Sequence, residues 1–331
     1  MPNKKGFQPL AWLRKRPATV DASTPIGWHR LEEPLMGTEV SVELWHEDPL
    51  EGMTAARAVM AEYHRINALM STYIEDSEIS RLNREAANGA FVVGQELFDL
   101  VARSLELAHL SGGCFDITYD SVGFLYDLRA GIVPSDDERR GKLPLINYRA
   151  VELDARARSI HYRQPGMRIN LGGIAKGYAV ERGAAILRDR GVRHALLNAG
   201  GDSRVVGDRR GQPWMIGVRD PRARDAVVAR LPLVDEAIST AGDYERFFDR
   251  DGVRYHHILN PTTGLPSTGV HSVTVIGPDA TMTDGLDTAI FVMGVQKGMA
   301  LIASLPHYEA VIVDDHGKLF YSDGLLTPGT S

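Results

Sequence analysis

The chain has 331 residues, of which 44% are hydrophobic and 24% charged, with a formal net charge of −6. These values are typical of a globular protein, and a negative net charge argues against non-specific nucleic-acid binding, which needs a basic surface. The single cysteine, Cys114, excludes an intramolecular disulfide and any site built from several cysteines. No apolar run approaches the roughly 20 residues that cross a bilayer, so no transmembrane segment is expected.

Residues 1–30 are expected to form a flexible N-terminal tail, with a basic cluster at Arg14, Lys15 and Arg16. The apolar stretch FQPLAWL is short and broken by Pro9, which makes it a poor secretory signal, and no cysteine follows that could carry a lipid. A cytoplasmic location is therefore expected, unless the start codon is wrongly assigned.

The first regular elements follow from their hydrophobic periods. Residues 38–45, TEVSVELW, alternate as a half-buried strand, whereas residues 54–70 carry apolar side chains at helical spacing. The polar run SEISRLN predicts a short surface helix over residues 77–83. A longer helix is predicted over 95–110, ending at Gly112-Gly113.

The segment after this glycine pair, CFDITYD, places two acids close to a turn. Asp116 and Asp120 are suited either to bind a ligand or to cap the next turn, and on their own the capping role is favoured. Residues 125–144 are rich in charge and turn formers. We expect a mobile loop there and a boundary between two lobes near residues 126–146.

The centre of the chain predicts short strands at 150–153, 159–162 and 168–171, and then a helix over 174–190 entered through Gly172-Gly173. Glycines before a helix start create an anion site, because unpaired amide groups point outward, and Lys176 adds a positive charge. The pattern matches neither the P-loop nor GxGxxG. Further strands are predicted within 195–207, 214–221 and 237–244.

The richest stretch runs from Tyr255 to Thr288. It predicts a strand at 254–259 that contains His257, a second strand at 271–276, and a helix from about residue 283. Asp284 and Thr288 lie four residues apart on that helix, with Asp287 beside them, so their oxygens share a face. Such oxygens suit Mg²⁺, but Asp and Thr are equally favoured at helix starts as caps. His257 alone is more often a structural residue than a catalyst.

Taken together, these features describe a site for a large phosphorylated ligand with a divalent cation. The chain also resembles the ApbE-like FAD:protein FMN transferases from about Glu33 to Asp323. The matching motifs, in order, are MGTEVSV, MSTY, SEISRLN, GCFDIT, NLGGIAKGYAVE, NAGGD, ISTAGDYER, HILNPTTGLP and TDGLDTA. Two departures are YDSVGFLYDL after GCFDIT and Gly285, where the family more often has alanine.

The resemblance implies an α+β fold, related to the T-fold, with mixed and largely antiparallel sheets flanked by helices. One domain would span residues 31–325, with FAD in a cleft between two lobes. The enzyme would use Mg²⁺ to transfer the FMN half of FAD to a Thr or Ser hydroxyl of an acceptor flavoprotein, releasing AMP. The metal ligands it implies are Asp284, Thr288 and the backbone carbonyl of Ala175.

The same resemblance places a set of residues against FAD: Met36, Ser71, Thr72, Tyr73, Asp116, Lys176, Glu181, His257 and Ile258. His257 is the natural general base for the attacking hydroxyl, although it would also suit a role in positioning the phosphate. Two rival functions use the same residues, namely hydrolysis of FAD to FMN and AMP, and FAD binding without chemistry. The sequence does not identify the acceptor or the oligomeric state.

Overall fold

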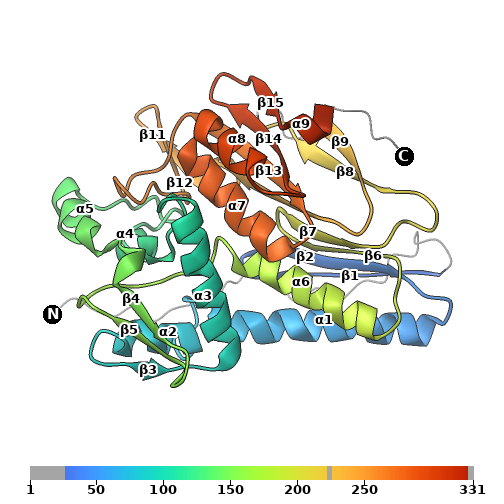
Figure 1. Cartoon of the computed structure of the whole chain (residues 1–331), viewed down its shortest axis with the longest axis horizontal. Coiled ribbons are helices and arrows are strands. Elements are labelled where there is room, and N and C mark those ends of the chain that lie inside the picture. The colour runs from blue at the N-terminus through green and yellow to red at the C-terminus, as the bar shows by residue number, and fades with distance from the viewer. Residues whose placement is uncertain (1–26, 222–225, 327–331) are drawn as a thin grey trace.

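The computed structural model describes residues 27–221 and 226–326. Its largest element is an eight-stranded antiparallel sheet with the order β1-β2-β6-β7-β10-β13-β14-β15 (Figure 1). The strands of this sheet are β1 Trp28–Leu35, β2 Thr38–Trp45, β6 Ala195–Ala199, β7 Asp202–Val206, β10 Ala237–Gly242, β13 Val270–Gly277, β14 Glu309–Asp314 and β15 Leu319–Tyr321.

Long helices cover one face of this sheet, with α6 between α1 and α7 (Figure 1). Each helix buries the apolar stripe that its sequence period predicts, for example Val59, Tyr63 and Ile66 on α1. The helices are α1 Pro49–Met70, α2 Glu78–Glu85, α3 Gln95–Leu110, α4 Asp120–Gly123, α5 Asp136–Lys142, α6 Ala175–Asp189, α7 Ala280–Met293, α8 Val295–Ala303 and α9 Asp323–Leu326, with short 3-10 turns at Ile117–Tyr119, Leu143–Leu145 and Tyr148–Ala150. In the part of the chain that the structure describes, no helix has the length and apolarity to cross a membrane.

The central strands are buried on both faces. Val206 and Val275 pack into the main core under the helices, whereas their neighbours Val205 and Ile276 pack into a second cluster with Trp214. That second cluster lies under a hairpin of β8 Trp214–Arg219 and β9 Val227–Leu233. Because successive side chains of a strand point to opposite faces, one sheet supports both cores.

A smaller region holds α2, α3 and a three-stranded sheet with the order β3-β5-β4 (Figure 1). Its strands are β3 Phe91–Val92, β4 Val151–Asp154 and β5 Ser159–Tyr162, and a separate hairpin joins β11 Phe247–Arg250 to β12 Val253–His256. The expected α+β class is confirmed, since every strand pair of the described residues is antiparallel and helices flank the large sheet. The expected domain bounds and two lobes stay a prediction.

Several local predictions are wrong. The strand predicted at residues 254–259 ends at His256, so His257 lies just after it, because the Ile258 amide donates to the His256 side chain at 3.3 Å. Residues 168–171 form no strand, because side chains take the place of a neighbouring strand: Asn83 accepts from the Ile169 amide at 2.8 Å and donates to the Ile169 carbonyl at 2.9 Å. Residues 125–144 are not simply a loop, since they contain α5, which begins with a capping box of Ser135 and Glu138.

The short helix at SEISRLN exists as α2, but Ile79 and Leu82 are fully buried, so it is amphipathic and not a polar surface segment. The predicted tail, residues 1–30, lies mostly outside the described residues. Its last residues are not tail, because β1 begins at Trp28.

Candidate active site

The first turns of α6 and α7 meet directly. The Gly177 amide donates to Asp284 Oδ2 at 2.8 Å, which ties one helix start to the other. A Cβ atom on Gly177 would lie 2.1 Å from the Ala280 carbonyl oxygen, so only glycine allows this approach. The predicted convergence of the two helix starts is therefore present.

Three buried acids gather at this junction. Asp284 and Asp287 come from α7, and Asp202 is the first residue of β7; carboxylate oxygens of the three lie within 4.8 Å of one another. Burial and the neighbouring Asp202 carboxylate together raise the pKa of Asp284 to about 7, although Lys176 opposes the shift. Burial and the carboxylates of Asp202 and Asp284 raise the pKa of Asp287 well above its usual range, again against the effect of Lys176.

Lys176 lies among these acids. Its ammonium forms an ion pair with Asp202 Oδ2 and lies 3.4 Å from Asp284 Oδ1. Burial alone would lower the pKa of Lys176, but Asp202 and Asp284 outweigh it and hold the pKa above the usual value. The lysine is therefore a fixed positive charge in the site.

The residues present fit a hard divalent cation. The donors are carboxylates and a hydroxyl: Thr288 Oγ1 is 3.2 Å from Asp287 Oδ1, and it lies against Gly173, two residues before Ala175. Asp202 Oδ1 is buried and has no hydrogen-bond partner in the described part of the chain. An all-oxygen set with one unpartnered carboxylate oxygen suits Mg²⁺.

His257 directly follows β12, and its neighbour anchors it. The buried His256 bonds through Nε2 to the Ser267 carbonyl oxygen at 2.9 Å. His257 Nδ1 is buried and has no hydrogen-bond partner among the residues that the structure describes. Burial, together with the nearby charges of Arg246 and Lys176, lowers the pKa of His257 to about 3. In the ligand-free protein the imidazole is thus neutral at pH 7, with a ring nitrogen free to accept a proton.

Met36 occupies the β1–β2 turn with a positive φ of 53°. The next residue, Gly37, faces the guanidinium of Arg246, which would lie 3.2 Å from a Cβ there. Since Arg246 also lowers the pKa of His257, the Met36 turn and His257 both lie near Arg246.

The Ser71–Tyr73 segment follows α1 and contacts Asn170, which lies in the segment that leads into α6. Asn170 Nδ2 donates to Thr72 Oγ1 and to Asp120 Oδ1, both at 3.2 Å. The side-chain oxygen of Asn170 accepts a hydrogen bond from the Gly172 amide at 2.8 Å, which stabilises the turn at Gly172-Gly173 before α6. Tyr73 is 89% exposed, so it offers a large free aromatic face.

Three predicted FAD contacts are engaged by the protein itself. Asp116 accepts from both Thr118 and the Tyr148 amide, as the favoured capping role requires. Glu181 accepts from the Ala280 amide at 2.9 Å and pairs with buried Arg204. Ile258 is buried in the main core.

Of Asp116, Glu181 and Ile258, Glu181 lies beside the junction of α6 and α7, because it bonds the first residue of α7. Their contact with FAD stays a prediction.

Sequence reasoning missed Asp202 and Arg246 as members of this site. Both lie in motifs that were recognised, NAGGD and ISTAGDYER, but neither was given a role. The signal for Asp202 was its position directly after a glycine pair, at the start of a strand. Arg246 carries no local signal, because the turn that it faces is more than 200 residues away in sequence.

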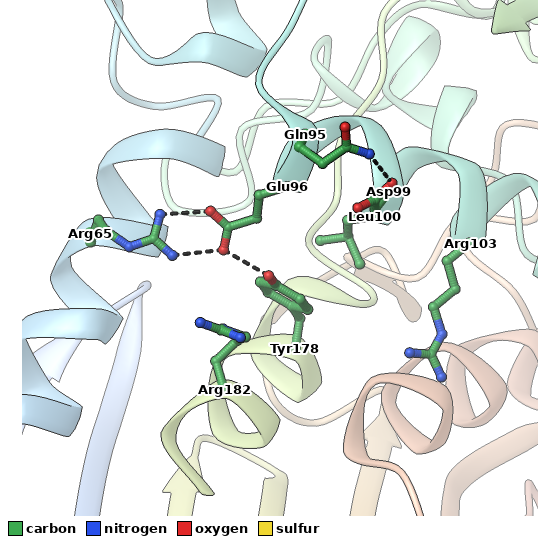
Figure 2. Close-up of a pocket in the computed structure, with 8 residues that line it drawn as sticks. All are labelled: Arg65, Gln95, Glu96, Asp99, Leu100, Arg103, Tyr178 and Arg182. Carbon is green, nitrogen blue, oxygen red and sulfur yellow. Dashed lines mark hydrogen bonds and ion pairs between the residues drawn. The ribbon is translucent and has the colours of Figure 1, made fainter. Parts of the chain in front are cut away.

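A separate hollow of about 470 Å³ lies between α1, α3 and α6 (Figure 2). Its polar groups satisfy each other: Arg65 bonds both oxygens of Glu96 at 2.6 and 2.7 Å, and Tyr178 donates to Glu96 at 2.7 Å. Tyr178 is two residues from Lys176, on the other side of α6. The bonds across this hollow link α1, α3 and α6 to one another, so we assign it a structural role and not a place in the site.

Comparison with known proteins agrees with this geometry. The sequence pattern of the ApbE family matches residues 36–312. A protein from Vibrio cholerae named FAD:protein FMN transferase is 33% identical over 307 residues, which cover 88% of this chain and 90% of the relative. One of the same name from Treponema pallidum is 32% identical over 314 residues, covering 89% and 86%.

Solved structures agree in fold. The crystal structure of an ApbE protein from Thermotoga maritima superposes with a TM-score of 0.84 at 35% identity, covering 90% of this chain and 98% of that one. The flavin transferase ApbE from Vibrio cholerae gives a TM-score of 0.81 at 30% identity, covering 91% and 99%. The chain belongs to the ApbE family.

Proposed function

We propose that this protein is an FAD:protein FMN transferase that uses Mg²⁺ to move the FMN half of FAD onto a Thr or Ser hydroxyl of an acceptor protein, with release of AMP. Relatives with this name cover nearly the whole chain. The observation that carries the proposal is the buried oxygen cluster where α6 and α7 meet, together with His257, which is near enough for Lys176 of the cluster to lower its pKa and whose ring nitrogen Nδ1 has no partner among the described residues.

The residues that would hold the cation are Asp284, Thr288 and the Ala175 carbonyl. A bound Mg²⁺ supplies Lewis-acid neutralisation of the phosphoanhydride, which an attack by a neutral hydroxyl requires. Lys176 lies beside these ligands and adds a second positive charge close to the phosphates. Buried charges act strongly on a reacting phosphate because little water screens them.

In the transfer step the acceptor oxygen forms a bond to the phosphorus of the FMN half, and the bond from that phosphorus to the AMP oxygen breaks. AMP leaves with the electron pair. The hydroxyl proton passes to His257 Nδ1, the ring nitrogen that no protein group occupies. The pKa of about 3 describes the site without substrate, and approaching phosphate anions raise it toward the range where a base is effective.

FAD is proposed to lie between the Met36 turn, the Ser71–Tyr73 segment and the acid cluster. The exposed ring of Tyr73 suits a planar aromatic ligand, because stacking covers two apolar faces at once. Location in the cytoplasm also remains a proposal, which cell fractionation tests.

The test is an incubation of the purified protein with FAD, Mg²⁺ and flavoprotein subunits from its own host. AMP release is measured together with flavin fluorescence on a denaturing gel. A fluorescent band that appears with AMP and disappears with chelator supports the proposal.

The matched variants for this test are Asp284→Asn, which should lose the band, and Asp243→Asn, a buried acid outside the cluster, which should keep it. AMP and free FMN without a labelled band would instead indicate an FAD hydrolase. Tight FAD binding without AMP would indicate a binding module.

A further inference from the structure

Asp202 is held rigidly at the acid cluster by the turn between β6 and β7. A Cβ atom on Gly201 would lie 2.6 Å from the Thr240 carbonyl oxygen, so this turn is pressed against β10. On the other side of the turn, Asn198 Nδ2 donates to Ser203 Oγ at 2.9 Å. The Asp202 side chain therefore starts from a backbone that has little freedom to move.

The Asp202 carboxylate is fully buried but only half satisfied. One oxygen accepts a hydrogen bond from the ammonium of Lys176, and the other, Oδ1, has no hydrogen-bond partner within residues 27–221 and 226–326. Burying a carboxylate is costly unless pairing and hydrogen bonds compensate for lost water. Asp202 is also one of the three carboxylates that each place an oxygen within 4.8 Å of the other two.

Asp202 adds a third carboxylate to the two that α7 supplies, from a separate strand. A further carboxylate oxygen strengthens the binding of a hard divalent cation, which prefers oxygen ligands. The ammonium of Lys176 already neutralises part of the cluster in the ion-free protein.

We infer that Asp202 is a further residue of the cation site: its carboxylate increases the affinity for a divalent cation directly, and pairs with Lys176 when no cation is bound. This inference rests on the proposed cation dependence of the transferase. It assigns to Asp202 a role beyond the ligands Asp284, Thr288 and Ala175. Groups just outside a metal's ligand set typically change its affinity by about 10- to 100-fold.

The experiment measures ion binding and not activity. Mn²⁺ prefers the same oxygen ligands as Mg²⁺, and its paramagnetic resonance signal reports the free ion. Titration of the full chain without FAD should show one bound Mn²⁺ that excess Mg²⁺ displaces. Asp202→Asn keeps the shape of the side chain and removes its charge, and it should raise the Kd for Mn²⁺ at least tenfold.

Asp243→Asn is the matched control, because Asp243 is also a buried acid and bonds His271 at 2.7 Å outside the cluster. Its Kd for Mn²⁺ should equal that of the wild type. Thermal unfolding followed by circular dichroism confirms that each variant is folded before titration.

A double variant separates a direct effect from an effect through the lysine. Lys176→Met removes the ammonium that competes for the carboxylates, so it should bind Mn²⁺ at least as tightly as the wild type. Asp202→Asn in this background should still weaken binding at least tenfold. This double variant also removes both members of the Lys176–Asp202 ion pair, so neither of these two charges is left buried without the other.

Two results would overturn the inference. One is an unchanged Kd for Asp202→Asn, and the other is a loss that vanishes in the Lys176→Met background, which would reduce Asp202 to an anchor for the lysine. Failure of the proposed function would give a different result. Either the wild type would bind no Mn²⁺, or Asp284→Asn would bind Mn²⁺ as tightly as the wild type does. In both cases the inference about Asp202 would also be refuted.

Discussion

Gly177→Ala tests whether the close approach of α6 and α7 builds the site. The new Cβ would lie 2.1 Å from the Ala280 carbonyl oxygen and 2.6 Å from Asp284 Cβ. To reach a tolerable contact the helix starts must separate by about 1 Å. The bond from the Gly177 amide to Asp284, now 2.8 Å, would then exceed hydrogen-bond length.

Gly177→Ala should have a small effect on the folding free energy and a large effect on the rate of transfer. Overpacking typically costs about 1–3 kcal/mol, and replacing a helical glycine by alanine recovers about 1 kcal/mol. The net loss of folding free energy is therefore about 0–2 kcal/mol. A displacement of about 1 Å at a catalytic group can lower the rate about 100-fold.

The assay combines urea unfolding with the rate of AMP release over a range of Mg²⁺ concentrations. Gly183→Ala is the control on the same helix, because its Cβ would meet only side chains, 2.6 Å from Leu197 and 3.0 Å from Val59. It should lose a similar amount of stability but keep the Mg²⁺ dependence of the wild type. Wild-type kinetics in Gly177→Ala would refute the reasoning.

Three further predictions use other parts of the molecule. His257→Ala should slow FMN transfer by about 10²- to 10⁴-fold while FAD still binds, measured by single-turnover AMP release and flavin fluorescence; an unchanged rate removes it as a base. The hydrogen bond from Arg65 lowers the pKa of Glu96 below 4.5, so Glu96 stabilises the fold above that pH and the effect disappears as pH falls through the folded pKa. Glu96→Gln should therefore be less stable than the wild type at pH 7 and equally stable at low pH in urea titrations, and a pH-independent difference would contradict this. Gly285→Ala places a Cβ 2.2 Å from Leu107 Cδ2, so it should cost about 1–3 kcal/mol, and Leu107→Val should relieve the cost in thermal unfolding.

Helices and strands with a clear hydrophobic period were predictable from the sequence. The strand at residues 38–45 and the helix at 95–110 have the expected bounds, because alternating or helical burial follows directly from their patterns. The start of α5 was also visible, since Ser135 and Glu138 have the spacing of a capping box, but the charge of the segment favoured a loop.

Other features depend on partners that are distant in the sequence. Residues 168–171 have the composition of a strand, and only the contact with Asn83, 86 positions away, shows that side chains satisfy their backbone instead. In the same way, the pairing of Lys176 with Asp202 joins a helix start to a separate strand. No local pattern encodes such a contact.

The departure at Gly285 has a local explanation only in three dimensions. Leu107 on α3 fills the space that a side chain at position 285 would take. The sequence shows the unusual glycine, but it does not show which neighbouring side chain occupies the space beside it.

The ion pair between Lys176 and Asp202 also bears on how the protein is made. Many metal sites leave mutually repelling ligands until the ion arrives, so those proteins fold only when loaded. Here the ammonium of Lys176 neutralises part of the negative charge of the acids. We therefore expect the protein to fold in the presence of chelator and to bind the cation afterwards. Loading would then stabilise the finished fold by mass action, by about 2.7 kcal/mol when the free ion is 100 times its Kd.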